Sequence, residues 1–360
     1  MTAPPRSNRR DNDVVWLHRA ALGERDGAPH PVKASSQSAV AIAHPNIALA
    51  KYWGKRPYGH NLPAVPSLSV TLAGMATRTK VAFDDALAED VFVLNGSEAR
   101  GESLTRVSGL LDRIRKRTDI GTKARVESAN DFPTASGLAS SASAFAALAV
   151  AASAAAGLDL DRAVLSDLAR RTSVSAARSV LGGFVELRAG KEGDEDLPAT
   201  EIAAPNHWDV AIVVAVTREG PKDVGSSEGM KHTMQTSPYT DAWIERAPAL
   251  FERVRSGVID RDLSAIGPAV EQSALMMHAA AIAADPGILY FTGATVEAIN
   301  AVRKMRKDGL EGYLTIDAGP HVKVLTRGAD AERVAETMRA VPGVLRTIVA
   351  RPGPGAHVES

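Results

Sequence analysis

One passage of strand, loop and helix constrains the fold of this chain more than any other feature. The stretch Leu138–Leu158 is the longest apolar run, and most of it is alanine. Alanine enters lipid far less favourably than leucine or isoleucine, so the run predicts a buried helix and not a membrane span. A strand-like segment at 124–128 and a loop of small residues at 130–137 precede it. The unpaired N–H groups at the helix N-terminus therefore follow a loop whose small side chains let a ligand approach the backbone closely.

The same passage predicts an anion site. Pro133 and Gly137 set the turn. The helix dipole favours negative charge at the N-terminus, where Ser140 and Ser141 add hydroxyl donors and Ser141 is a candidate magnesium ligand. The spacing lacks the Gly-Lys-Ser/Thr ending of a Walker motif. Because a run of serine, alanine and glycine also suits helix capping and close packing, the passage alone leaves both interpretations open.

Composition limits the classes of partner. The 360 residues carry 42 Lys plus Arg and 42 Asp plus Glu, so the net charge supplies no long-range field for nucleic acid or an anionic membrane. With no cysteine, the chain has no disulfide, thiolate metal site or thiol nucleophile, which fits a reducing compartment, and we expect the cytoplasm. The nine histidines are scattered without metal-ligand spacing. Any anion-binding site must therefore be local.

The order of expected elements predicts two lobes, residues 38–200 and 201–352. Residues 1–37 lack the apolar core of a secretory signal and read as a flexible extension, and residues 353–360 read as a frayed tail. The second lobe is expected to run as strand 209–216, helices 241–256, 263–284 and 295–307, strands 313–316 and 322–325, helix 331–340 and strand 345–350. Apart from the two long helices, this is the order of a ferredoxin-like half.

A second motif follows the first expected strand, at 39–43. A polar loop is predicted from His44 onward, and it includes the run Asn46–Arg56. In this run two lysines flank Tyr52 and Trp53, so cationic groups could grip a polyanion while the aromatic pair encloses a small apolar body. A solvated basic turn with one buried aromatic ring is the alternative.

Four segments of the chain, taken together, resemble the diphosphomevalonate decarboxylase family of the GHMP kinase superfamily. They are the run 46–56 with 63–72, the phosphate loop with Pro133, Gly137, Leu138, Ser140 and Ser141, the segment 173–179 leading to 182–186, and Thr315–Gly319 leading to Val322 and Lys323. They occur in family order and span about residues 38–350. The resemblance implies an α+β GHMP-kinase fold whose N-terminal lobe carries the phosphate loop, whose C-terminal lobe is ferredoxin-like, and whose active site lies in the cleft between them.

The resemblance also implies a reaction. Members of the family use one ATP, with Mg²⁺, to turn the tertiary 3-hydroxyl of a phosphorylated 3-hydroxy acid into a leaving group, and carbon dioxide departs as the C–O bond breaks. The products are isopentenyl diphosphate, ADP, phosphate and carbon dioxide. Such a site must activate a hydroxyl, hold the terminal phosphate in line and fix a carboxylate. A homodimer is a further family expectation.

The resemblance assigns roles to individual residues. Asp317 matches the aspartate that accepts or orients the hydroxyl proton, although a lone Asp-Ala-Gly would otherwise be read as a turn. Arg178 matches the arginine that positions the carboxylate, and Lys51 the lysine beside the transferred phosphate. The expected substrate contacts are Tyr52, Trp53, Gly54, Lys55, Arg78, Ser173, Ser175, Arg178 and Ser227. The expected ATP contacts are Pro133, Ser136, Gly137, Leu138, Ala139, Ser140 and Ser141.

The chain departs from the family pattern at several positions. Val174 stands where glycine is usual, which stiffens the backbone between two expected substrate-binding serines. His321 replaces asparagine and adds a donor or a titrating group beside Asp317. Met234 stands where some bacterial members have an arginine for the diphosphate, and Asp285-Pro286-Gly287 replaces a double proline.

Rival functions stay open at this point. A decarboxylase of the monophosphate needs one cationic contact fewer, which Met234 favours. A kinase that stops at the 3-phosphate and a noncatalytic metabolite-binding protein are the other rivals. Retention of Lys51, Arg178 and Asp317 together favours the complete decarboxylation. The zero net charge and the lack of a basic stripe argue against nucleic-acid binding.

Overall fold

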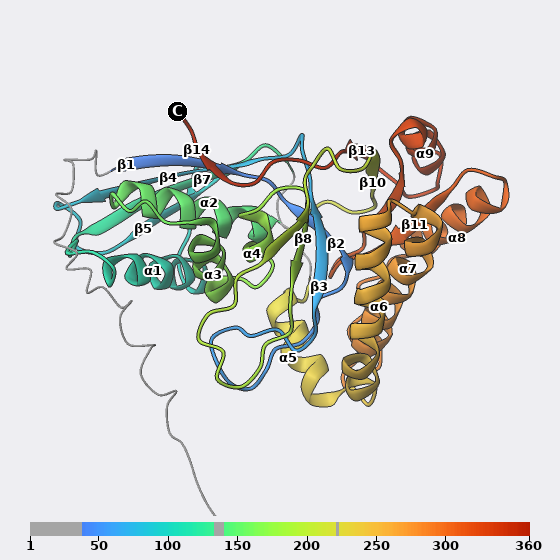
Figure 1. The fold of residues 1–360 in the computed structure, drawn as a ribbon, viewed down its shortest axis with the longest axis horizontal. Helices are drawn as coiled ribbons and strands as arrows, with labels where there is room; N and C mark the ends of the chain where they lie inside the picture. Colours follow the sequence, from blue (N-terminus) through green and yellow to red (C-terminus); the bar gives the residue numbers. More distant parts are fainter. Residues whose placement is uncertain (1–37, 133–139, 221–222) are drawn as a thin grey trace, which may run out of the picture. The chain divides into compact units, whose positions relative to one another are not determined.

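The computed structural model describes residues 38–132, 140–220 and 223–360, which belong to one compact unit (Figure 1). The predicted extension 1–37 and most of the predicted phosphate loop lie outside these residues. Three sheets organise the described part, and helices cover them. No described helix has both the length and the apolar character that a membrane crossing requires.

The first sheet carries the alanine-rich helix. Its strands, in spatial order, are β14 (His357–Val358), β1 (Ser38–Ala43), β4 (Thr77–Asp84), β7 (Lys123–Asn130), β5 (Val91–Leu94) and β6 (Ser97–Glu98). Helix α2 (Ser140–Ala155) packs its alanines against Val81, Phe83 and Val126 from alternate positions of β4 and β7. The prediction of a buried helix is therefore confirmed for 140–155. Helices α1 (Glu102–Arg115), α3 (Arg162–Thr172) and α4 (Ala176–Ser179) lie around it.

The second sheet lies between the first sheet and the part of the chain that follows residue 204 (Figure 1). It comprises, in order, β2 (Asn46–Ala50), β3 (Ser67–Thr71), β8 (Phe184–Leu187) and β9 (Thr200–Ala203). The prediction of a polar loop from His44 was wrong for 46–50, because every residue of β2 is buried. The one strongly polar side chain in β2, Asn46, donates its amide hydrogens to Ser175 O and Ser179 Oγ at 3.0 and 2.7 Å, so burial leaves its donors satisfied.

The third sheet has the ferredoxin-like order. Its strands run β11 (Gly312–Thr315), β12 (Val322–Arg327), β10 (Val210–Val216) and β13 (Arg346–Ala350), all antiparallel. Every residue of β10 is buried because alternate residues serve two cores. Ile212 and Val214 face helices α6 (Thr240–Asp260) and α7 (Leu263–Ile282), whereas Ala211 and Val213 face α8 (Gly293–Lys307) and α9 (Ala331–Arg339). A short α5 (Ser226–Thr236) precedes α6, and a 3₁₀ turn (Gly328–Asp330) precedes α9.

The core behind the second sheet joins residues from both sides of the predicted boundary. Ile47 and Leu68 share one hydrophobic cluster with Ile212, Leu250 and Ile266. The division at residue 200 stays a prediction.

The chain end is not frayed, contrary to expectation. His357 and Val358 pair with Ile42 and Ala41 of β1. The Pro-Gly steps before them allow close packing, since a Cβ on Gly353 would lie 2.4 Å from Ala73 N and one on Gly355 2.6 Å from Val180 O. These glycines therefore anchor the segment to the loop after β3 and to the turn after α4.

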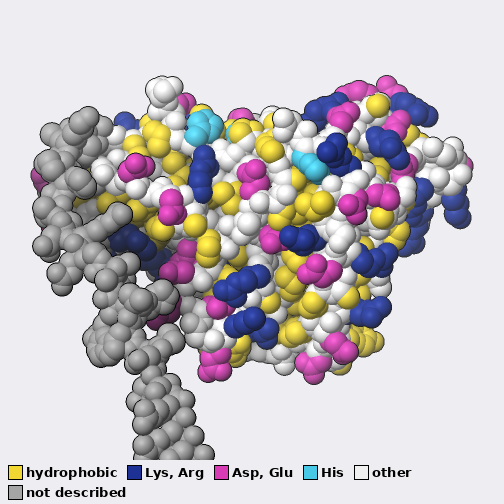
Figure 2. Space-filling model, in the orientation of Figure 1, with side chains coloured by type: hydrophobic (Ala, Val, Ile, Leu, Met, Phe, Trp, Pro, Cys, Tyr) yellow, Lys and Arg dark blue, Asp and Glu magenta, His cyan; other side chains and the backbone are white. Residues whose placement is uncertain are grey.

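Charge of both signs is interspersed on the face drawn in Figure 2, where neither Lys and Arg nor Asp and Glu gather into one continuous patch. This distribution agrees with the zero net charge of the sequence.

Candidate active site

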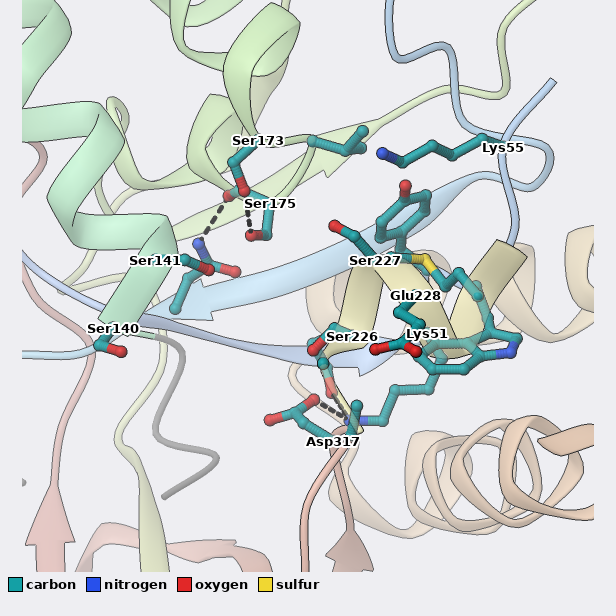
Figure 3. Close-up of a pocket in the computed structure, with 18 of the residues that line it drawn as sticks. Lys51, Lys55, Ser140, Ser141, Ser173, Ser175, Ser226, Ser227, Glu228 and Asp317 are labelled. Atoms are coloured by element: carbon teal, nitrogen blue, oxygen red, sulfur yellow. Dashed lines mark hydrogen bonds and ion pairs between the residues drawn. The ribbon is translucent and has the colours of Figure 1, made fainter. Parts of the chain in front are cut away.

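A cavity of about 390 Å³ opens where the three sheets and their helices meet, and it collects most of the residues singled out in the sequence (Figure 3). The predicted residues that line it are Lys51, Tyr52, Trp53, Lys55, Ser140, Ser141, Ser173, Ser175, Arg178, Ser227 and Asp317. They come from segments far apart in the chain, so the fold brings them together.

Asp317 lies in the turn between β11 and β12, and an ammonium group contacts each of its carboxylate oxygens. Lys51 Nζ is 2.5 Å from Oδ1, and Lys323 Nζ is 3.0 Å from Oδ2. Burial is the largest single influence on this group and opposes ionisation, but Lys323 and Lys51 together outweigh it and hold the pKa of Asp317 well below its usual range. The carboxylate therefore stays ionised and can only accept hydrogen bonds.

Lys51 immediately follows β2 and is almost completely buried. Its Nζ also donates to Ala48 O at 3.0 Å, and its backbone N–H donates to Ser273 Oγ of α7 at 2.9 Å. Burial lowers the pKa of Lys51, Asp317 opposes this change and Lys323 adds to it, and the net result is a pKa of about 8. Lys51 can therefore lose its proton within the range of pH in which enzymes are usually assayed.

Arg178 reaches the site from α4, and two serines of β3 hold its side chain. Its Nε donates to Ser69 Oγ at 2.9 Å and its Nη1 to Ser67 Oγ at 2.7 Å. Serines two residues apart on a strand point to the same face, so β3 fixes the plane of the guanidinium. Burial lowers the pKa of Arg178 to about 10, which keeps it cationic at neutral pH. Neither serine has a role assigned from the sequence, although their alternation within the run 63–72 is a visible signal.

These four groups carry an unbalanced charge, and the three cations are buried while the Asp317 side chain is 23% exposed. Lys51, Lys323 and Arg178 are cations, and Asp317 is the single carboxylate among them. Buried charges are costly unless they are paired, so the cluster favours an anionic ligand at the base of the cavity.

The serine-rich turn before α4 lies along one wall. Ser173 and Ser175 hydroxyl oxygens are 3.4 Å apart, and both line the cavity (Figure 3). Val174 between them packs with Leu62 and Ala177 in a small hydrophobic cluster, so the residue that replaces the usual glycine is anchored in the protein interior.

Further cationic groups lie nearer the opening. Lys55 Nζ donates to Asn61 Oδ1 at 2.7 Å, and burial together with Arg106 lowers the pKa of Lys55. Arg106, which sequence reasoning missed, donates to Thr172 O at 3.1 Å, and its guanidinium lies 4.5 Å from the centre of the Phe145 ring. No motif marks Arg106, because it reaches the cavity only through the packing of α1 against α2. Tyr52 turns a buried hydroxyl into the same space, with no hydrogen-bond partner among the described residues.

The expected ATP contacts are described only in part. Ser140 and Ser141 begin α2 and line the cavity. Pro133, Ser136, Gly137, Leu138 and Ala139 lie outside the described residues. Within residues 38–132, 140–220 and 223–360 no group of three or more His, Cys, Asp or Glu could hold a metal ion.

Two predicted substrate contacts do not reach the cavity. Arg78 occupies an outward position of β4, where buried and exposed residues alternate, and it pairs with Glu359 at 2.5 Å on the surface. Its assignment as a substrate contact was wrong because the local motif did not reveal which face of the strand it occupies. Gly54 has a φ of 101° and lies behind the cavity wall, where a Cβ would be 2.5 Å from Met234 Sδ.

The departures noted in the sequence take on new meanings. Met234 packs behind Gly54 and does not line the cavity, whereas Ser226 and Glu228 of α5 do. His321 is fully buried, its Nδ1 accepts a hydrogen bond from Thr217 N at 3.2 Å, and burial lowers its pKa to about 3. Of the two roles that the sequence offered for His321, a donor or a titrating group beside Asp317, titration therefore does not fit neutral pH.

Comparison with known proteins agrees with this geometry. Residues 43–199 match the diphosphomevalonate decarboxylase-like N-terminal domain, and residues 212–348 match the mevalonate 5-diphosphate decarboxylase C-terminal domain. A diphosphomevalonate decarboxylase of Candida albicans is 32% identical, over 82% of this chain and 86% of that protein. A phosphomevalonate decarboxylase of Haloferax volcanii is 33% identical, over 83% and 91%.

A solved structure extends the agreement to three dimensions. It is described as MDDEF in complex with MVAPP, AMPPCP and magnesium, and its TM-score to this chain is 0.84 at 38% identity, over 90% of this chain and 99% of that one. Both halves of the sequence and the fold as a whole thus match the same family. The chain belongs to the diphosphomevalonate decarboxylase family.

Proposed function

We propose that the protein catalyses the ATP-dependent decarboxylation of (R)-5-diphosphomevalonate to isopentenyl diphosphate, with release of ADP, phosphate and carbon dioxide. The observation that carries the proposal is the buried cluster of three cations around Asp317 at the base of the cavity. A noncatalytic metabolite-binding protein has no need of an ionised carboxylate held between two buried ammonium groups, and such a cluster is costly to bury.

Asp317, Lys51 and Arg178 have separate roles in the proposed reaction. Asp317 accepts a hydrogen bond from the 3-hydroxyl and orients its oxygen toward the terminal phosphorus of ATP. Because the pKa of Asp317 is low, the hydroxyl proton moves only when bonding to phosphorus has made that oxygen acidic, which fits a loose phosphoryl-transfer transition state. Lys51 lies beside that oxygen and stabilises the negative charge that develops there.

Arg178 positions the substrate carboxylate for the loss of carbon dioxide. Its guanidinium, fixed by Ser67 and Ser69, holds the substrate carboxylate in one orientation. When the C–O bond to the new phosphate breaks, the C–C bond to the carboxylate supplies the electron pair of the alkene, and carbon dioxide leaves. The charge on the carboxylate is lost in this step, so its position matters more than the strength of its binding.

The helix N-terminus at Ser140 and Ser141 fits the phosphates of ATP. Hydroxyl oxygens at a helix N-terminus suit an anion, and the hard oxygen of Ser141 suits Mg²⁺. Bound there, Mg²⁺ would neutralise charge on the phosphates during transfer. The related complex with AMPPCP and magnesium supports both ligands.

The expected homodimer and cytoplasmic location are part of the same proposal. They rest on the family resemblance and, for the compartment, on the absence of cysteine. Light scattering of the purified protein would give its mass in solution.

The direct test measures carbon dioxide and ADP release from the purified protein with Mg²⁺ and ATP. Diphosphomevalonate, 5-phosphomevalonate and mevalonate are offered in parallel. Stoichiometric release of both products from diphosphomevalonate is the expected result. Release of ADP without carbon dioxide would identify a kinase, and release of neither would favour a metabolite-binding protein.

A second candidate substrate is 5-phosphomevalonate. The observation that favours it is the presence of two carboxylates, Glu102 and Glu228, in the same cavity lining as Lys55 and Arg106. A second phosphate adds negative charge to a region where acidic groups already offset the cations. The Haloferax volcanii relative carries the name of the monophosphate enzyme. A higher kcat/KM for the monophosphate in the same assay would decide for this substrate.

A further inference from the structure

A second lysine contacts the aspartate at the base of the cavity. Lys323 lies on β12 between Thr315 of β11 and Val214 of β10, and its exposed fraction is 0%. Its Nζ is 3.0 Å from Asp317 Oδ2, whereas Lys51 reaches Oδ1 from the opposite half of the sequence. Each carboxylate oxygen therefore has its own ammonium group.

The position of Lys323 makes a packing role a poor explanation. Its neighbours on β12, Val322 and Val324, are completely buried aliphatic residues. A strand buried on both faces normally carries such residues, because burying an ammonium group has a large desolvation cost. The contact with Asp317 compensates the buried charge of Lys323, so we attribute the role of Lys323 to its charge at Asp317.

The other charged and titratable groups around Asp317 do not duplicate this contact. Arg178 approaches from α4, but its Nε and Nη1 are bound to serines. His278 of α7 and His321 of the adjoining turn are neutral at assay pH, because burial lowers each pKa to about 3. Burial raises the pKa of Tyr52, so this group is neutral as well. Among the residues that the structure describes, Lys51 and Lys323 are thus the two cations in direct contact with the carboxylate.

We propose that Lys323 is a positioning residue for the reaction: it anchors Oδ2 of Asp317, so that the carboxylate stays ionised and keeps one orientation toward the substrate hydroxyl. This inference rests on the proposed function, and it adds a residue that acts through Asp317 without touching the substrate. Lys323 also acts on Lys51, because the repulsion between the two ammonium groups helps to lower the pKa of Lys51 to about 8. Removal of Lys323 should therefore raise the pKa values of both Asp317 and Lys51.

The test compares Lys323→Met, which keeps the volume and removes the charge, with Lys323→Arg, which keeps the charge. kcat and KM are measured by carbon dioxide release from pH 5 to 10, and thermal unfolding reports the fold. In Lys323→Met we expect kcat to fall ~100-fold, as for a misplaced reacting group, with a smaller change in KM. The alkaline limb of the kcat/KM profile, which the deprotonation of Lys51 sets, should move to higher pH, while Lys323→Arg keeps it near the wild-type position. The phosphate groups of the substrate titrate equally in all three proteins, so they cancel in the comparison.

A loss of activity with an unmoved alkaline limb would reduce Lys323 to a structural residue, and wild-type kcat in Lys323→Met would overturn the proposal outright. A second readout needs no substrate. NMR titration of the lysine side chains should give a higher pKa for Lys51 in Lys323→Met, or in Lys323→Gln if the methionine variant does not fold. An unchanged Lys51 pKa would overturn the proposal whatever the activity. A raised pKa in a protein that releases no carbon dioxide would contradict the proposed function and leave the charge coupling in place.

Discussion

The base and the rim of the cavity differ in how their charges are held. At the base, Lys51, Lys323 and Arg178 are almost fully buried. The two lysines contact Asp317, and Arg178 is bound to the serines of β3. At the rim, Lys55 and Arg106 are half-buried, and Glu102 and Glu228 are exposed. Charges interact strongly where water is excluded and weakly where it is not. The base is therefore built for chemistry and the rim for affinity and substrate choice, and the variants below test that division.

The largest effect is expected at Asp317. Asp317→Asn keeps the volume and removes the charge, so we expect kcat to fall ~1,000-fold or more, in line with the loss of a group that handles the reacting proton. ATP binding, measured by calorimetry, should change little because the proposed phosphate site is at the start of α2. Thermal unfolding is the control for a loss of stability, because the two lysines lose their charged partner in this variant. Substantial remaining turnover would remove Asp317 from its assigned role.

Arg178→Lys comes next. Lysine keeps the charge but lacks the planar fork whose separate nitrogens bond Ser67 and Ser69 and hold a carboxylate, so kcat/KM should fall ~100-fold, as when one preorganised donor is removed. Ser69→Ala removes a single contact and provides a graded comparison, with a smaller loss. Near-normal rates in Arg178→Lys would mean that the substrate carboxylate is held elsewhere.

A smaller effect, of opposite sign, is expected at the rim. Glu228→Gln removes a negative charge from the lining, so kcat/KM for diphosphomevalonate should rise ~3-fold, the size of a partly screened interaction between charges. The gain for the monophosphate should be smaller. Glu252→Gln on α6, which removes the same charge from an exposed position outside the cavity lining, is the matched control. Equal gains in both variants would attribute the effect to net charge and not to Glu228.

The smallest effect is expected at Arg78. Because its side chain pairs with Glu359 on the surface, Arg78→Ala should leave kcat/KM within ~2-fold and stability within ~1 kcal/mol, as is usual for an exposed ion pair. Urea unfolding and the decarboxylation assay measure the two quantities. A large loss of activity with unchanged stability would return Arg78 to the substrate site.

Much of the fold could be predicted from the sequence because its signals are local. The alanine run predicted α2, and the order of elements after residue 209 predicted the third sheet. Residues 46–50 were predicted as a loop because Asn46 and the neighbouring lysines looked polar, and no local signal indicated that Ser175 and Ser179 would satisfy the asparagine amide.

The sequence predicted some residues of the candidate site and missed others. Motifs named Lys51, Arg178 and Asp317, and the structure places all three at one cavity. Lys323 stood in a quoted motif without a role, and Arg106 stood in none. Both act through contacts that a motif cannot express: a buried ion pair in one case and the packing of two helices in the other.

The sequence by itself determined the family, the type of most elements and three candidate residues, because these depend on patterns within short segments. Only the tertiary structure decided which groups meet, since Lys51 and Asp317 are 266 positions apart and Arg178 and Ser69 are 109 apart. It also decided their charge states. The pKa of a buried lysine follows from desolvation and from the charges around it, and both arise only when distant segments pack together.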